Sequence, residues 1–226
     1  MNYGGGQSVA SSGEIEALSF ALKGANAISP ITIFDVGAHD GEYLKAALPF
    51  LGKNGRAFCF EPQLATFQSL TEAFANDRRV TITNAALGKK EGIGMLFSSE
   101  DGVTTASLHP QEAFQSSRQV RITTVDHFCE ENAITQIDLL KIDTEGHEME
   151  VLLGAAKALD AGLIHAIQFE FGDTFVGTGY HFSDVFRLLS PKFRIFRILR
   201  SGLYEISQYS HDLEIYKLSN FMCTRR

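Results

Sequence analysis

The sequence contains few cysteines and none of the patterns that cysteine chemistry requires. Its 226 residues include three, Cys59, Cys129 and Cys223, which lie far apart and never form a C-x-x-C pair. This spacing argues against a disulfide framework and against a structural zinc site. It favours reduced thiols, and so we expect a cytoplasmic protein.

An excess of basic residues and a long apolar run are also lacking. The formal net charge is -7 at pH 7, which argues against a general electrostatic grip on phosphate backbones and predicts no nucleic-acid partner. No apolar stretch is long enough to cross a bilayer, so we expect a soluble protein without a membrane span. Residues 1–13 are rich in Gly and Ser, with no basic residue ahead of an apolar run. They predict a flexible N-terminal arm and no signal peptide.

The remaining residues, 14–226, predict a single α/β domain. Hydrophobic residues make up 44% of the chain and charged residues 21%, a balance typical of one globular core. Short apolar runs alternate with amphipathic segments, which is the pattern of an open, mainly parallel sheet with helices on both faces. The alternation is interrupted over residues 93–124, where we expect an insertion or lid with a Ser/Thr/Gly-rich stretch at 98–107. The C-terminal residues 193–226 predict two or three strands with an antiparallel pair.

The segment 137–155, IDLLKIDTEGHEMEVLLGA, places an acidic cluster at the end of a buried strand. Its apolar run at 137–142 is typical of a strand covered on both faces. Asp143, Glu145 and His147 follow at once, and a helical pattern then runs from Glu148 to Leu159. Strand, acidic turn and helix in direct succession are typical of an α/β ligand site. Lys141, flanked by apolar residues, is expected to be a structural ion-pair partner.

A second ligand loop lies in IFDVGAHDGEY, where Asp35 ends a strand and a helix follows. Gly37 and Gly41 permit positive φ and close backbone approach, but no third glycine completes the G-x-G-x-x-G spacing that admits a pyrophosphate. Asp40 and Glu42 add negative charge where a pyrophosphate would lie. The loop therefore favours a cationic or zwitterionic ligand.

The ends of the next two strands indicate which other groups the ligand carries. Glu61, in CFEP, lies where a carboxylate can accept hydrogen bonds from a ribose diol. The next strand ends at Asn84 and Ala85, where an amide and a small residue can pass under an adenine ring. Together, the glycine loop, the acid placed for the ribose and the turn placed for the base suit an adenosine that carries a positive charge and no phosphates. S-adenosylmethionine meets these demands.

The segments IFDVGAHDGEY, FCFEP, TNAALG, VRITTVDHF, NFMCTR and above all IDLLKIDTEGHEMEVLLGA resemble the FkbM family of S-adenosylmethionine-dependent methyltransferases. The resemblance spans residue 31 to the end of the chain. It implies the Rossmann-like class I methyltransferase sheet of seven strands, and methylation of a hydroxyl on a sugar, glycan or secondary metabolite. It also implies a set of cofactor-binding residues: Asp35, Gly37, Ala38, His39 and Gly41 at the methionine end, Glu61 at the ribose, and Asn84 and Ala85 at the adenine. His39 stands where Asn is frequent in the family.

Methyl transfer to a hydroxyl needs a base beside the acceptor. The candidates are Asp143, Glu145 and His147, and the sequence does not rank one above the others. We expect no metal site, with one alternative left open, a Mg²⁺ or Ca²⁺ ion held by carboxylates: Asp143, Glu145, Glu148 and Glu170.

Two other functions stay open on the sequence. One is an NAD(P)-dependent oxidoreductase on a related sheet, which the glycine spacing disfavours. The other is a non-catalytic module that binds a nucleoside and uses residues 98–107 for a partner. The acceptor, a small molecule or a glycan, and the oligomeric state are not identified.

Overall fold

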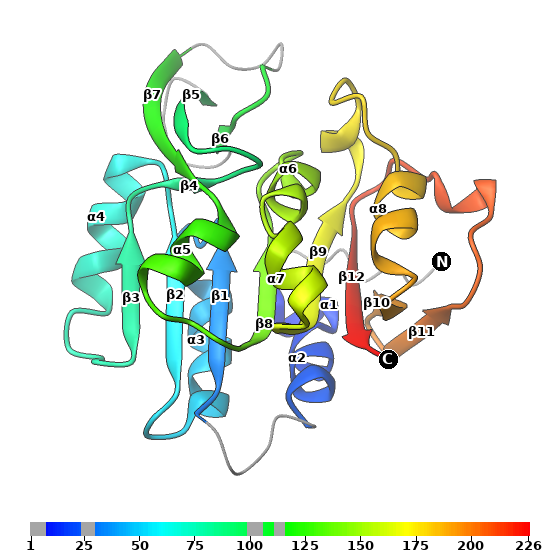
Figure 1. The fold of residues 1–226 in the computed structure, drawn as a ribbon, viewed down its shortest axis with the longest axis horizontal. Coiled ribbons are helices and arrows are strands. Elements are labelled where there is room, and N and C mark those ends of the chain that lie inside the picture. Colours follow the sequence, from blue (N-terminus) through cyan, green and yellow to red (C-terminus); the bar gives the residue numbers. More distant parts are fainter. Residues whose placement is uncertain (1–7, 24–29, 99–105, 111–115) are drawn as a thin grey trace.

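The computed structural model describes residues 8–23, 30–98, 106–110 and 116–226. Its main sheet has eight strands in the order β11-β10-β12-β9-β8-β1-β2-β3 (Figure 1). The bounds are β1 Thr32–Val36, β2 Arg56–Phe60, β3 Val80–Thr83, β8 Ile137–Ile142, β9 Ile164–Phe171, β10 Phe193–Leu199, β11 Gly202–Ile206 and β12 Ser219–Arg225.

The sheet is parallel from β3 to β9 and antiparallel beyond. All residues of β1 and β8 are buried, as expected of apolar runs in the middle of a covered parallel sheet. The two strands pair in a register that sets Asp35 opposite Lys141. The mainly parallel sheet is confirmed, with one strand more than the seven expected, because the chain after β10 turns back and adds β11 as an antiparallel edge strand.

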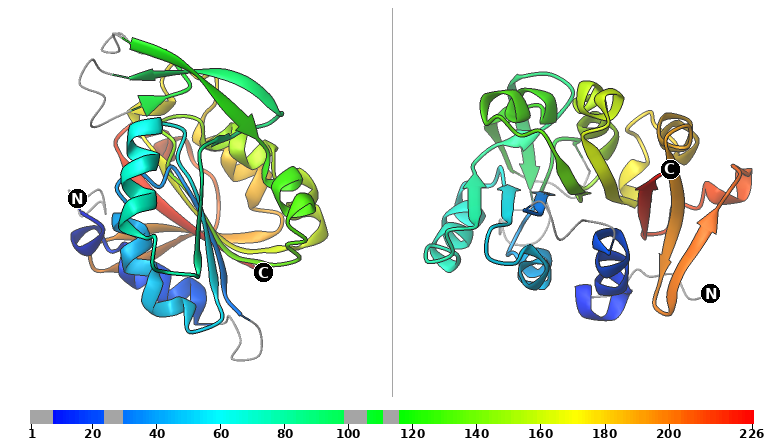
Figure 2. Two further views of the ribbon diagram at one scale, coloured as in Figure 1. Left: turned by 90° about the vertical axis from the view of Figure 1, so that its left-hand side faces the viewer. Right: turned by 60° about the horizontal axis from the view of Figure 1, so that its bottom comes forward.

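Helices cover both faces of the sheet (Figure 2). One face carries α1 Val9–Ser12, α2 Glu14–Leu22, α3 Glu42–Leu51 and α4 Leu64–Ala73, and the other carries α5 Val125–Glu131, α6 Glu148–Leu153, α7 Ala156–Ala161 and α8 Phe182–Leu189. Each face has its own apolar core cluster. Two short 3₁₀ turns, η1 Asp173–Phe175 and η2 His211–Leu213, lie in the later connections.

The expected single helix from Glu148 to Leu159 is wrong, because the chain breaks into α6 and α7 at Gly154. A Cβ at Gly154 would lie 2.0 Å from the carbonyl oxygen of Gly88, so the backbone of another segment packs directly against this point. The carbonyl of Gly154 accepts a hydrogen bond from the amide of Asp126, whose carboxylate in turn caps the first turn of α7 at the amides of residues 157 and 158. These partners replace the helical hydrogen bonds that the break removes.

The interruption expected at residues 93–124 is part of a small second sheet that begins earlier in the chain, at Ala86 (Figure 1). Its strands, in the order β4-β7-β5-β6, are β4 Ala86–Leu87, β5 Gly92–Ser98, β6 Ala106–Ser107 and β7 Ser116–Thr123. It stands above the carboxyl ends of β1 and β2, which is the end where α/β sheets bind ligands (Figure 1). Most of the Ser/Thr/Gly-rich stretch at 98–107 lies outside the described residues.

The described part of the expected N-terminal arm, residues 8–13, contains helix α1. The hydroxyl of Ser12 donates to the carboxylate of Glu14 at 2.6 Å, and both side chains are buried. The backbone of this segment is thus packed beside the sheet, while residues 1–7 lie outside the described part.

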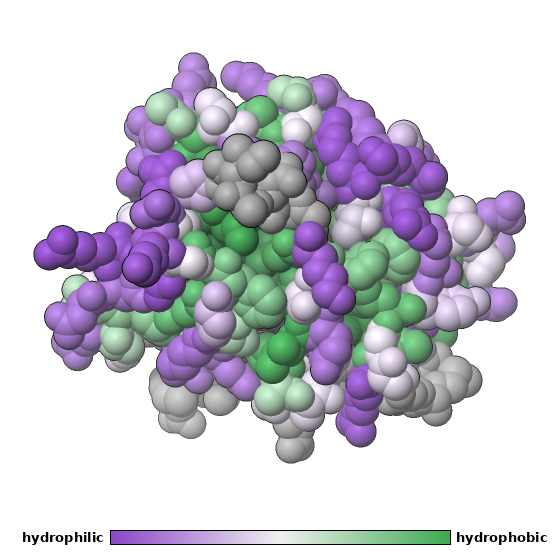
Figure 3. All heavy atoms as spheres, turned by 90° about the horizontal axis from the view of Figure 1, so that it is seen from below, coloured by the Kyte–Doolittle hydropathy of each residue, from purple (hydrophilic) through white to green (hydrophobic). Residues whose placement is uncertain are grey.

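The end of the molecule where the parallel strands begin has a partly hydrophobic surface (Figure 3). Figure 3 shows hydrophobic residues gathered in its middle, with hydrophilic residues around them. Of the helices that the structure describes, none is long and apolar enough to span a membrane. The polar residues singled out from the sequence lie at the opposite end, under the small sheet.

Candidate active site

The loop after β1 requires glycine for reasons the structure makes specific. Gly37 has a φ of +77°, and a Cβ there would lie 1.7 Å from the carbonyl oxygen of Asp143. Gly41 also has a φ of +77° and meets the side chains of Leu70 and Phe74. No other residue type fits at Gly37 without displacing Asp143, so the loop and the acidic turn are in direct backbone contact.

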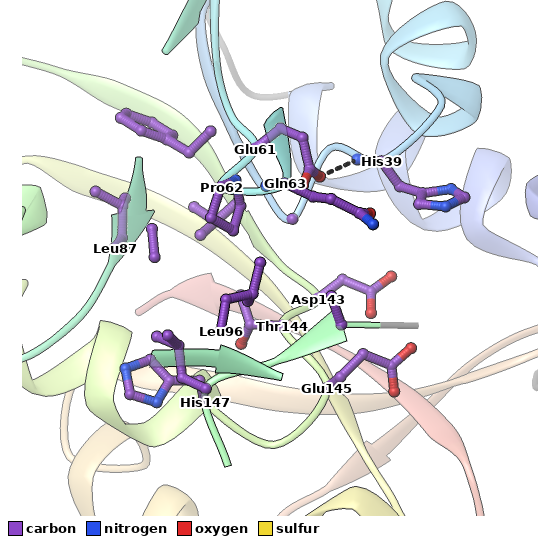
Figure 4. A pocket seen from close by; sticks show the side chains of 16 residues that line it. His39, Glu61, Pro62, Gln63, Leu87, Leu96, Asp143, Thr144, Glu145 and His147 are labelled. Carbon is purple, nitrogen blue, oxygen red and sulfur yellow. Dashed lines mark hydrogen bonds between the residues drawn. The ribbon is translucent and has the colours of Figure 1, made fainter. Parts of the chain in front are cut away.

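Glu61, just beyond β2, lies against that loop. Its carboxylate accepts the amide hydrogen of His39 at 2.9 Å and that of Gln63 at 2.8 Å (Figure 4). Burial raises its pKa, an effect that the two amide hydrogen bonds oppose. Each carboxylate oxygen has a further lone pair, so Glu61 can also accept hydrogen bonds from the two hydroxyls of a ribose.

Asn84 and Ala85 lie behind the pocket and do not line it. The Asn84 amide donates to the carbonyls of Glu61 at 2.8 Å and Pro62 at 3.1 Å, and Ala85 is fully buried. Asn84 therefore fixes the turn that carries Glu61. The wall expected from these two residues is formed instead by Ala86 and Leu87 of β4.

A pocket opens between this loop, the acidic turn and the small sheet (Figure 4). Its lining divides into a polar and an apolar half. Gln63, Asp143 and Glu145 extend toward one side, and Leu87 and Leu96 lie at the other. An apolar slot that suits a flat base thus continues into a polar region with acidic side chains.

Asp35 does not line the pocket, because it is fully buried beneath it. Its carboxylate lies 3.2 Å from the Lys141 ammonium, which lies 3.3 Å from Asp143. The two carboxylates raise the pKa of Lys141 against the opposing effect of burial. Lys141 is thus the buried ion-pair partner that the sequence indicates, and it joins the β1 end to the acidic turn.

The acidic turn brings three carboxylates together. Asp143 and Glu145 come from the turn after β8, and Glu170 comes from β9. One oxygen of each lies within 4.8 Å of the others. Burial and the negative charge of Asp143 raise the pKa of Glu145 to about 7. Glu145 is held with a φ of +55°, a conformation costly for a non-glycine residue and often seen at functional sites.

Glu148 does not belong to this group of three carboxylates, because its own carboxylate is hydrogen-bonded within the turn. Its carboxylate accepts the amides of Thr144 at 2.8 Å and Gly146 at 3.0 Å, and the hydroxyl of Thr144 at 3.0 Å. These bonds hold the acidic turn in shape. We therefore assign Glu148 to the frame of the turn and remove it from the alternative metal site.

His147 faces the small sheet and lies apart from Asp143 and Glu145 in the pocket (Figure 4). Its Nδ1 lies 3.2 Å from Nε2 of His109, which belongs to the segment after β6. Burial and the neighbouring His109 lower the pKa of His147 to about 4, so the imidazole is neutral at pH 7. Ser107 adds a second tie, because its hydroxyl donates to the carbonyl of Glu145 at 2.7 Å.

The structure thus brings together most of the residues predicted from the sequence. Pocket-lining members are Gly37, His39, Glu61, Asp143, Glu145 and His147. Ala38 and Gly41 shape the loop, Asp35 lies beneath it, and Asn84 and Ala85 lie behind it. His109 and Leu96 are additional site residues that the sequence did not indicate, since nothing in it predicts where the inserted sheet packs. Gln63 was missed as well, although it lies only two residues after Glu61.

The pocket fits the nucleoside that the resemblance implies. Apolar side chains offer a slot for adenine, Glu61 offers acceptors for the ribose, and the acidic residues suit a sulfonium and an ammonium. Asp40 and the carboxylates of the polar half would instead repel a pyrophosphate. The donor set therefore favours S-adenosylmethionine over a dinucleotide.

Comparison with known proteins agrees with a methyltransferase site. A model of the FkbM methyltransferase domain matches residues 35–198. The hexuronic acid methyltransferase AglP of Haloferax volcanii is 26% identical over 130 residues, which are 57% of this chain and 52% of that protein. The chain thus spans about half the length of this curated relative.

Solved structures share the fold. The methyltransferase FkbM from Methylobacillus flagellatus superposes with a TM-score of 0.54 at 17% identity, over 86% of this chain and 43% of that one. The plantazolicin methyltransferase BpumL in complex with SAH gives a TM-score of 0.50 at 11% identity, over 96% and 86% of the two chains. The chain belongs to the FkbM family of methyltransferases, which have the class I α/β fold and use S-adenosylmethionine as cofactor.

Proposed function

We propose that this methyltransferase O-methylates a hydroxyl of a sugar or glycan acceptor. The observation that carries the proposal is the position of the carboxylates of Asp143 and Glu145 in the wall of the nucleoside pocket. The cofactor supplies a methyl group already activated by its sulfonium. The protein must therefore align the acceptor oxygen and remove its proton, for which a carboxylate in the pocket wall is suited.

Asp143 is the foremost candidate for that base. Lys141 lies 3.3 Å from one carboxylate oxygen of Asp143. The Asp143 side chain is nevertheless 38% exposed, so its carboxylate remains accessible from the pocket. Its amide donates to the carbonyl of Val36, which ties it to the loop end of β1. His147 is less suited, because it faces His109 and the small sheet.

The surroundings of the acidic turn support a polar acceptor. A second hollow adjoins the turn and is lined by His109, Pro110, Asp173, Thr174, Val176 and Gly177. Hydroxyl, imidazole and carboxylate groups at one hollow offer the mixed donors and acceptors that sugar hydroxyls need. The relative named as a hexuronic acid methyltransferase is consistent with an acceptor of this class.

Replacing Glu61 with Gln should weaken binding of S-adenosylhomocysteine by about tenfold to a hundredfold, the scale of losing charged hydrogen bonds. The substitution keeps the shape but turns an amide group toward the amide hydrogens of His39 or Gln63. Calorimetric titration measures the change. Glu72→Gln, at an exposed position on α4, is the matched control and should bind as the unmodified protein does. Equal affinities for the two variants would remove Glu61 from the cofactor site.

The reaction itself is tested by transfer of labelled methyl groups to a panel of neutral sugars, uronic acids and glycans. We expect a labelled ether on a hydroxyl, identified by mass spectrometry and NMR. Label on a nitrogen or a carboxylate would contradict O-methylation. A protein that binds the cofactor but labels no acceptor of the panel would favour the non-catalytic module.

The oxidoreductase alternative is tested separately. S-adenosylhomocysteine should raise the melting temperature, whereas NADH should not, because the acidic loop offers no pyrophosphate site. Stabilisation by NADH alone would reverse this assignment.

A further inference from the structure

Glu170 differs from the other buried acids of the site in having no partner. Its side chain is only 6% exposed. Within the described residues, no hydrogen bond or ion pair reaches its carboxylate. By contrast, the carboxylates of Glu61 and Glu148 accept backbone amides, and Asp35 is paired with Lys141. A buried carboxylate without a partner is costly, so its retention here points to a missing partner.

The position of Glu170 indicates what that partner is. One carboxylate oxygen each from Glu170, Asp143 and Glu145 lies within 4.8 Å of the others. Three acids converge from two adjacent strand ends, so their side chains surround a common point. A positive charge at that point would balance all three.

Lys141 forms no ion pair with Glu170, and its charge acts on that carboxyl only weakly, from a greater distance. Its ammonium lies 3.2 Å from Asp35, 3.3 Å from Asp143 and 3.4 Å from the carbonyl of Gly37. One cation thus serves two carboxylates, and Glu145 and Glu170 add two more negative charges when they are ionised. The four carboxylates would then exceed the charge of Lys141 by three. Burial and this crowding of acids raise the pKa of Glu145 to about 7 and that of Glu170 to about 10, and a divalent ion would offset most of the excess charge.

We propose that Asp143, Glu145 and Glu170 bind a hard divalent cation, Mg²⁺, Mn²⁺ or Ca²⁺. Hard cations prefer carboxylate oxygens, whereas Zn²⁺ and copper favour imidazole or thiolate, which this group lacks. Two oxygens on opposite sides of Ca²⁺ lie about 4.6 to 5.2 Å apart, and those around Mg²⁺ lie closer, so the observed span needs little adjustment. Asn220, opposite Glu170 in the sheet, lines a hollow together with Asp143 and Glu170 and offers a neutral amide oxygen.

The site goes beyond the function proposed above and differs from the sequence-based expectation of no metal. Its role in catalysis rests on the proposed function, since an ion at Asp143 would lie beside the acceptor and lower the pKa of its hydroxyl, and with the ion bound Asp143 would act as its ligand rather than as a free base. Binding of the ion does not rest on it. The two can therefore fail separately.

Titration of Mn²⁺ into metal-free protein without cofactor, followed by calorimetry and electron paramagnetic resonance, tests the proposal. We expect one ion per chain, displaced by Mg²⁺ or Ca²⁺. Glu170→Gln and Glu145→Gln should each weaken Mn²⁺ binding by about tenfold or more, because each removes a charged ligand. Glu72→Gln removes one charge from exposed α4 and should bind Mn²⁺ unchanged. Circular dichroism checks folding, and Glu145→Gln, nearer the surface, serves where Glu170→Gln does not fold.

Two outcomes would overturn the site. One is a folded protein that binds S-adenosylhomocysteine but, in the absence of any cofactor, takes up no Mn²⁺, which would mean that the three carboxyl groups need no ion. The other is Mn²⁺ binding that is equal in all three variants. Uptake of Mn²⁺ without methyl transfer to any acceptor would instead support the site and contradict the proposed function.

Discussion

Asp143→Asn should reduce turnover by about a hundredfold or more while the affinity for S-adenosylhomocysteine stays within about tenfold. The amide keeps the shape of the side chain but cannot take a proton from an acceptor hydroxyl. The Asp143 carboxylate lies 3.3 Å from the Lys141 ammonium, and at this distance the neutral amide of the variant can still accept a hydrogen bond. Labelled-methyl transfer at saturating cofactor gives the turnover, and calorimetry gives the affinity.

A matched control separates the loss of the base from the loss of one charge. Asp212→Asn removes a carboxylate at an exposed position in the 3₁₀ turn η2, and should leave turnover unchanged. If Asp143→Asn kept its turnover, Asp143 would be part of the frame and Glu145 would become the leading base.

Lys141→Met should lower the free energy of unfolding by about 3 to 5 kcal/mol, the cost typical of removing one partner of a buried ion pair. Methionine fills a similar volume but leaves the fully buried Asp35 without its cation. Lys141 also lies over the ring of Tyr43 at 5.2 Å, a contact that the uncharged side chain keeps only in part. Urea unfolding followed by circular dichroism measures the change.

The double variant Asp35→Asn with Lys141→Met tests the cause. It removes both charges, so it should recover part of the stability that Lys141→Met loses. A double variant no more stable than Lys141→Met alone would show that packing around Lys141, and not the unpaired carboxylate, accounts for the loss.

The sequence predicted the parts of the site that depend on local order along the chain. A strand end followed by Gly37, and another followed by Asp143, must meet at one edge when the strands are parallel, and the register of β1 with β8 confirms it. The ion pair of Lys141 with Asp35 follows from the same register. The strand-like runs at 31–36 and 137–142 were sufficient to place both central strands, β1 and β8.

The sequence could not predict features that depend on packing between distant segments. Helical periodicity continues through Gly154, and only the close approach of Gly88 shows why the helix breaks there. His147 was one of the three candidate bases, but its ring lies against His109 from the segment after β6. Asn84 carries an amide in the expected place, yet the turn after β2 uses that amide for its own carbonyls.

Calorimetric titration of the folded protein with S-adenosylhomocysteine tests the central claim most directly. The claim is that the pocket between Gly37, Glu61 and Asp143 is a nucleoside site. We expect saturable one-to-one binding that Glu61→Gln weakens and Glu72→Gln does not. A folded protein that shows no heat of binding, or binding that is indifferent to Glu61, would contradict it.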